Sequence, residues 1–134
     1  MKVLFFTMSS GRVPVLDFLK SLEARSRAEA FRVLEAVKKE GTAAAGVSCR
    51  QIKGKLWEIR VRSGGEVRIF YFIRGESPRS DDGKGSQGGN REREKGGQPE
   101  GEEMILLHAY LKKSKKAPTR EIETALARMK ELLI

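Results

Sequence analysis

Residues 56–74 read LWEIRVRSGGEVRIFYFIR, and the rest of the chain is organised around this stretch. Two runs rich in β-branched and aromatic residues, 56–62 and 66–73, flank a turn with two glycines, a pattern typical of a β-hairpin. Side chains alternate between the two faces of a strand. The sequence therefore predicts a hairpin that buries one apolar face and presents arginines on the other, namely Arg60, Arg62 and Arg68.

These arginines have two interpretations. Arginines on an exposed strand face commonly do no more than keep a protein soluble. Alternatively they line a phosphate-binding surface, because a guanidinium group forks onto phosphate oxygens in a planar, bidentate way. The residues around the hairpin bear on this choice.

The composition limits the classes of protein that need to be considered. A chain of 134 residues suits one domain, and its net charge of +9 with a pI of about 9.9 favours a polyanionic partner. The single cysteine, Cys49, allows no intramolecular disulfide. No apolar run is long enough to span a membrane, and the start MKVLFF is too short for a signal peptide. A cytoplasmic protein with no membrane partner is expected.

The segments before the hairpin are typical of one strand and two helices. Residues 2–7 form an apolar run that suits a strand. Pro14 suits the first turn of a helix, and Gly41 suits the end of another. Ser26, followed three residues later by Glu29, predicts a capping box that starts the second helix. The apolar stripes of both helices are expected to cover the inner face of the sheet as an antiparallel pair.

The segments after residue 103 predict a further strand and a final helix. In MILLHAYL, residues 104–111, alternation places Leu106, His108 and Tyr110 on one face. Thr119 is expected to cap the final helix. Between the strand and the helix lies a basic run that contains Lys112, Lys113, Lys115 and Lys116.

Two other segments carry charge. Lys53 and Lys55 precede the hairpin. Either both side chains point toward a ligand, or both are solvated residues before the strand. Residues 75–103 hold eight acidic and five basic side chains, so the remaining residues carry +12. Because this segment is rich in Gly, Ser, Pro and charge, we expect a disordered insertion within one domain. An acidic loop of this kind could also compete with nucleic acid for the basic face.

The side chains available favour chemistry on a phosphodiester without a metal or other cofactor. The sequence has no phosphate-binding glycine loop, no Cys/His cluster and no nucleophile elbow. RNA carries its own nucleophile, the 2′-hydroxyl, so its cleavage needs a base, an acid and cations that stabilise the charged phosphate. Arginines suit the last role, and His108 titrates in the range that proton transfer requires. A histidine at the edge of the core is the alternative for His108.

The chain resembles the HigB-like, phage-derived branch of the RelE/ParE toxin superfamily of bacterial toxin–antitoxin systems. The stretches that carry the resemblance are SGRVPVLDFLKSL, LWEIRVRSGGEVRIFYF and LLHAYLKKSKKAPTREIETALARMKEL. It implies an α+β, RelE-like fold, an antiparallel sheet with an N-terminal two-helix hairpin on one face and a C-terminal helix. It also implies a toxin that cuts mRNA in the ribosomal A site without a metal, and a helix-turn-helix antitoxin that blocks its basic surface.

The resemblance also implies roles for individual residues. Arg68 would contact the scissile phosphate, Arg60 would stabilise transition-state charge, and Lys113 or His108 would transfer protons. The expected RNA-binding residues are Lys53, Lys55, Arg62, Tyr110, Lys112, Lys115 and Lys116. Two departures from the family pattern are the insertion at 75–103 and Glu58, which stands where some relatives carry a lysine.

Two other functions fit the same sequence. ParE-type relatives poison DNA gyrase, but they tend to lack the basic catalytic set. A non-catalytic basic module that binds RNA or an acidic partner, or a toxin that has lost its activity, would bind with steep salt dependence and cut nothing.

Overall fold

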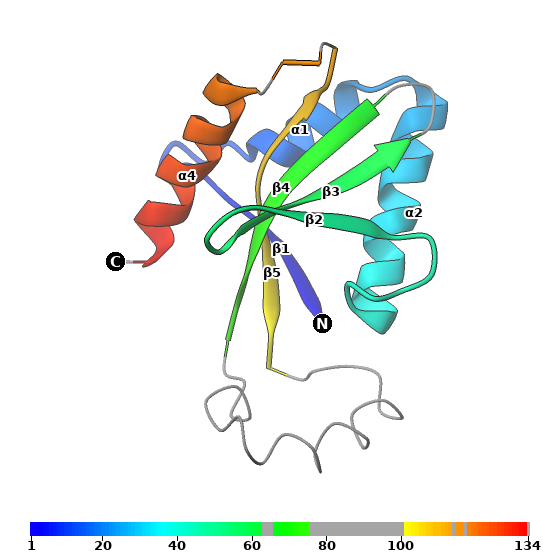
Figure 1. The fold of residues 1–134 in the computed structure, drawn as a ribbon, viewed down its shortest axis with the longest axis horizontal. Helices are drawn as coiled ribbons and strands as arrows, with labels where there is room; N and C mark the ends of the chain where they lie inside the picture. The colour runs from blue at the N-terminus through cyan, green and yellow to red at the C-terminus, as the bar shows by residue number, and fades with distance from the viewer. Residues whose placement is uncertain (63–65, 76–100, 114, 117, 134) are drawn as a thin grey trace.

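Helices cover both faces of one sheet in the computed structural model, which describes residues 1–62, 66–75, 101–113, 115–116 and 118–133 (Figure 1). The strands are β1 (Lys2–Phe5), β2 (Ser48–Lys53), β3 (Leu56–Arg62), β4 (Glu66–Arg74) and β5 (Glu103–Leu111). The helices are α1 (Pro14–Ser21), α2 (Ala24–Glu40) and α4 (Thr119–Leu133). These described elements make an α+β fold.

The strands lie in the order β1-β5-β4-β3-β2. Strands β2 to β5 form the expected antiparallel meander, and the predicted hairpin is β3 with β4. β1, however, pairs in parallel with the outer side of β5. The prediction of a wholly antiparallel sheet is therefore wrong. Parallel neighbours need a long connection between them, and here that connection is the entire run from α1 to β4, which no local pattern reveals.

The core has two parts, one on each face of the sheet. Under α1 and α2, the buried residues include Val15, Leu19, Leu34, Val37, Ile59 and Ile69. Under α4, they include Leu56, Phe70, Phe72, Leu107, Ala125 and Met129. The expectation of one buried face and one open arginine face is therefore wrong. Leu56, Phe70 and Phe72 share a face with the arginines and give the apolar stripe of α4 a surface on which to pack.

A β-bulge changes the predicted alternation in β5. Phe70 of β4 pairs with His108, but the next residue, Tyr71, pairs with Leu106, so Leu107 has no partner across the ladder. Leu106 therefore packs under α1 and α2, whereas Leu107, His108 and Tyr110 face α4. The prediction that Leu106 shares a face with His108 and Tyr110 is wrong, because the extra residue of a bulge inverts the alternation that follows it.

The start of α2 differs from the expectation, and its end does not. The helix begins at Ala24, so Ser26 lies inside it, where its hydroxyl donates to Oε2 of Glu23 at 3.4 Å. Glu29 instead pairs with Arg32 one turn later, so the predicted capping box is wrong. The helix ends at Gly41, whose φ of 82° suits glycine, as predicted.

Most of the predicted insertion, residues 76–100, lies outside the described residues, and Glu103 already belongs to β5. Gly75 follows β4 with a φ of 129°, and a Cβ atom there would lie 2.2 Å from the carbonyl oxygen of Gly101. The two ends of the connection therefore meet where only glycine fits. Among the described helices, none has both the length and the apolar character of a membrane span.

Candidate functional site

The sheet places three of the predicted site residues in one row on the α4 face. Arg60 on β3 is the Cα partner of Arg68 on β4, and Arg68 is the partner of Tyr110 on β5. Directly opposed residues on neighbouring strands stand about 4.5–5.5 Å apart at Cβ. The register therefore brings together two like charges and a phenol that the sequence could only place on separate strands.

Arg68 is buried, with only 3% of its surface exposed. Its Nη2 donates to Oε1 of Glu66 at 2.6 Å. Its Nε and Nη1 are also buried and find no hydrogen-bond partner among the described residues, and the same holds for Nε of Arg60. Each such orphaned donor costs about 1–3 kcal/mol. Two opposed cations with unused donors form a site that an oxyanion would complete.

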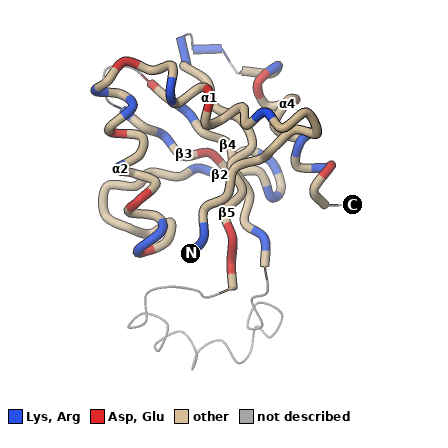
Figure 2. Tube along the Cα trace, turned by 180° about the vertical axis from the view of Figure 1, so that it is seen from behind, with Lys and Arg blue, Asp and Glu red and all other residues tan. Residues whose placement is uncertain are grey.

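A cleft of about 350 Å³ lies beside this row, between the end of β5 and the start of α4. Figure 2 shows the Lys and Arg positions at this upper end of the molecule. Burial, and next the nearby Glu58 carboxylate, raise the pKa of Tyr110 to about 12, so its hydroxyl keeps its proton at neutral pH. The polar residues that line the cleft are Tyr110, Lys112, Lys113, Lys116, Thr119, Arg120 and Glu121.

His108 lies behind Tyr110, in a stack of rings with Phe70. Its Nε2 is 2.5 Å from Oε1 of Glu121, and its Nδ1 is 3.4 Å from Nη1 of Arg128. Because a guanidinium group can only donate, Nδ1 accepts from Arg128 and the proton stands on Nε2, which donates to Glu121. Both ring nitrogens are thus engaged, and His108 reaches a ligand only if one of these contacts opens.

Glu58 and Arg50 add a second charged pair to the same face. Glu58 is 1% exposed, and its Oε2 lies 3.2 Å from Nη2 of Arg50, an ion pair without hydrogen-bond geometry. The attraction of Arg50 offsets part of the cost of burying this carboxylate. Glu58 was expected only as a departure from a family pattern, and Arg50 was not expected in the site.

The remaining predicted residues lie elsewhere. Lys53 ends β2 and Lys55 lies in the β2–β3 turn, five residues before Arg60, which along a strand is roughly 16 Å. Arg62 is exposed at the end of β3, where Glu66 is its Cα partner. Lys115 is exposed and does not line the cleft. The structure thus gathers Arg60, Arg68, Tyr110, Lys112, Lys113 and Lys116 at one end of the sheet, with His108 behind them.

Glu121 and Arg128 are the residues that the sequence reading missed. They lie seven positions apart on α4, and so on one side of that helix, beside the apolar positions that pack on the sheet. A pair of opposite charges bordering an apolar stripe at this spacing would have indicated a polar partner on the sheet. The partner is His108.

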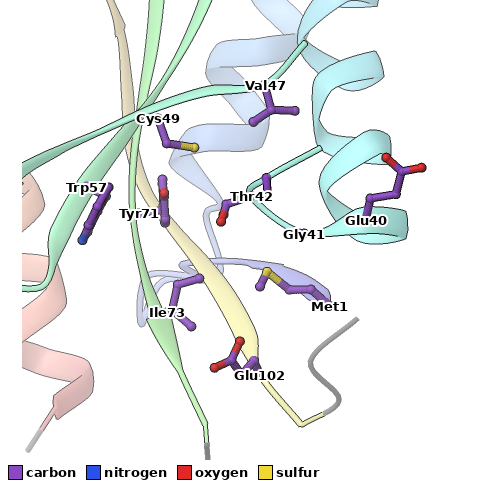
Figure 3. A pocket seen from close by; sticks show the side chains of 11 residues that line it. Met1, Glu40, Gly41, Thr42, Val47, Cys49, Trp57, Tyr71, Ile73 and Glu102 are labelled. Carbon is purple, nitrogen blue, oxygen red and sulfur yellow. The ribbon is translucent and has the colours of Figure 1, made fainter. Parts of the chain in front are cut away.

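A pocket of about 740 Å³ lies on the α1 and α2 side of the sheet and contains none of the predicted site residues (Figure 3). Trp57, Tyr71, Ile73 and Met1 give it apolar walls. Burial raises the pKa of Cys49 in this pocket, although a hydrogen bond with Tyr71 opposes the shift. The Cys49 thiol therefore stays protonated at neutral pH, which does not suit a nucleophile.

One comparison with known proteins gives a match. The family model described as Phage derived protein Gp49-like (DUF891) matches residues 17–77 and 99–130. The match covers α2, the β3–β4 hairpin, β5 and most of α4, and therefore the whole cluster of charged residues described above. No curated protein matches the chain.

Proposed function

We propose that this chain, which belongs to the Gp49-like family of phage-derived proteins, is the toxin of a type II toxin–antitoxin system. The activity that we assign to it is metal-independent cleavage of mRNA on the ribosome, in the cytoplasm, as in the HigB-like branch of the RelE/ParE superfamily. The family supports a toxin-like protein of phage origin with an antitoxin partner. The cleavage activity rests on the site.

The observation that carries the proposal is the pair of opposed arginines with unused donors. Arg60 and Arg68 are Cα partners, and Nε of Arg60 and Nε and Nη1 of Arg68 have no hydrogen-bond partner among the described residues. Non-bridging phosphate oxygens accept several hydrogen bonds from guanidinium groups. A phosphodiester would therefore satisfy donors that the described fold leaves orphaned, and would relieve the repulsion between the two cations.

The neighbouring groups suit the other steps of cleavage through the RNA 2′-hydroxyl. The lysines of the cleft, with Lys113 exposed and Lys112 half-buried, would hold the flanking phosphates. The protonated hydroxyl of Tyr110 lies beside Arg68 and is a hydrogen-bond donor for the reacting phosphate. His108 would exchange protons with the substrate after releasing Glu121. The proposed partner, a helix-turn-helix antitoxin, would cover this basic end.

Primer extension on a reporter mRNA, with and without translating ribosomes, tests the proposal. Wild type should cut only when ribosomes are present, and Arg68→Met should not cut. Arg74→Met is the matched control, because Arg74 lies on the same strand and also pairs with a carboxylate, that of Glu103, but far from the cleft. Cleavage by Arg68→Met at the wild-type rate would contradict the proposed role of Arg68.

A second candidate function is a basic RNA-binding module without catalysis. It is favoured by the burial of Arg68 and by the engagement of both nitrogens of His108, which together leave two of the predicted catalytic side chains occupied by contacts within the protein. In the same assay this module would leave the mRNA intact, while its binding to RNA would fall steeply with salt.

A further inference from the structure

Glu66 holds an unusual position in the site. It opens β4, and its carboxylate is the hydrogen-bonding partner of Arg68 at 2.6 Å. The two side chains differ sharply in their contact with solvent, because 47% of the Glu66 side chain is exposed but only 3% of the Arg68 side chain. The backbone carbonyl of Glu66 accepts from the backbone N–H of Lys112 at 2.8 Å, which fixes Glu66 next to the basic run.

The two partners of this ion pair would respond differently to its opening. A half-exposed carboxylate that leaves Arg68 exchanges one hydrogen bond for others to water, so its release costs little. A buried guanidinium without an acceptor would lose much more stabilising free energy, so another anion must take the place of the carboxylate. Phosphate oxygens and carboxylate oxygens accept from the same fork of guanidinium donors. The pair is thus built so that Glu66 leaves only when another oxyanion arrives.

We propose that Glu66 is a resident counter-ion, which a phosphate group of the bound nucleic acid displaces from Arg68. The inference rests on the proposed function only in taking Arg68 as a phosphate site, and it does not require that the RNA is cut. In the free protein Glu66 neutralises a buried cation, and in the complex it swings out toward solvent and its cross-strand neighbour Arg62. Glu66 therefore weakens binding, because its carboxylate occupies Nη2 of the guanidinium group that the phosphate must reach.

The test compares affinities for a probe that cannot be cut. A fluorescein-labelled single-stranded RNA, in which every 2′-hydroxyl is methylated, is titrated with each variant at fixed ionic strength. Glu66→Gln keeps an acceptor for Arg68 but makes it neutral, and should bind the probe about fivefold to tenfold more tightly than wild type. Glu35→Gln is the control, since Glu35 is an exposed, ion-paired glutamate on α2 with the same charge, and its affinity should match that of wild type.

Two further variants separate displacement from a general effect of charge. Glu66→Asp keeps the net charge but shortens the reach by one methylene, so it should also bind more tightly than wild type. In an Arg68→Met background, Glu66→Gln should bring no gain. The proposal is overturned if Glu66→Asp binds like wild type while Glu66→Gln gains, or if the gain survives without Arg68. Tighter binding by Glu66→Gln without any mRNA cleavage by wild type would sustain this inference and refute the catalytic part of the proposed function.

Discussion

Replacing Arg68 by methionine should stabilise the protein while it abolishes the proposed activity. Methionine fills a similar volume with an unbranched, adaptable side chain, so it creates little cavity. It removes three things: the buried donors that have no partner among the described residues, the charge opposed to Arg60, and the hydrogen bond to Glu66. The first two destabilise the native fold, and only the third stabilises it.

The magnitudes favour a net gain. Nε and Nη1 of Arg68 are orphaned and buried, and at about 1–3 kcal/mol for each atom they cost roughly 2–6 kcal/mol. The hydrogen bond to the carboxylate of Glu66 stabilises the native state by about 1.5–3 kcal/mol. Because that carboxylate is half-exposed, water hydrates it once Arg68 is gone. We expect Arg68→Met to raise the free energy of unfolding by about 1–3 kcal/mol, because the partner that it leaves behind, Glu66, is not a buried charge.

Urea denaturation followed by the fluorescence of Trp57, the single tryptophan, measures this difference. Arg74→Met, where the arginine is 43% exposed and paired with Glu103, should change the free energy of unfolding by less than about 0.5 kcal/mol. If Arg68→Met instead lowers the stability by more than about 1 kcal/mol, the donors of Arg68 are satisfied in solution. An oxyanion would then find no unused donor at Arg68.

Three other predictions follow from single contacts. Because the pKa of Tyr110 is raised to about 12 in the folded protein, above its ordinary value of 10, its contribution to stability is complete below pH 10 and is lost as the pH rises toward 12. Absorbance at 295 nm should therefore show almost no phenolate at pH 10 in wild type, and Tyr110→Phe should reduce the alkaline loss of stability but not remove it, because burial also raises the pKa of Tyr71. Nitrogen-15 spectra of His108, the single histidine, should show the proton of the neutral ring on Nε2, and removal of both partners, by Glu121→Ala together with Arg128→Met, should weaken that preference. A proton on Nδ1 in wild type would contradict the contact with α4. Gly75→Ala should destabilise the protein more than Gly54→Ala in thermal melts, because both glycines have a positive φ but only at Gly75 does an added Cβ meet backbone atoms. Equal decreases in melting temperature would refute this.

The elements of the fold could be predicted from local patterns, but their arrangement could not. The hairpin of β3 and β4, the end of α2 at Gly41 and the final helix each follow from spacing that the sequence displays. The parallel pairing of β1 with β5 depends on segments about a hundred residues apart, for which no local signal exists. The bulge at Leu107 could not be predicted for a different reason. A strand buried on both faces has apolar residues on both faces, so its sequence pattern is the same with or without an extra residue.

The predicted site shows the same division. That arginines would share a face followed from alternation, and the structure places Arg60 and Arg68 on one face as opposed partners. The burial of Arg68 could not be predicted from alternation, because the residues that cover its face come from α4, which is remote in sequence. Nothing in the sequence distinguishes Glu66, because a glutamate next to a turn is common. Only the distance of 2.6 Å to a buried guanidinium makes it exceptional.

The burial of Arg68 changes what the basic charge of this protein means. An exposed arginine attracts any polyanion, and salt screens that attraction within about 10 Å at moderate ionic strength. Arg68 is buried, and another anion binds it only by replacing the carboxylate of Glu66. It therefore discriminates among anions by shape, because the incoming oxygen must fit where a carboxylate oxygen sat. The exposed lysines of the cleft can therefore gather nucleic acid of any sequence, while the row of Arg60, Arg68 and Tyr110 accepts one phosphate in one position. We expect this division to appear as two salt dependences, a steep one for overall binding that Arg68→Met changes only slightly, and a shallow one for the cleavage step that Arg68→Met removes.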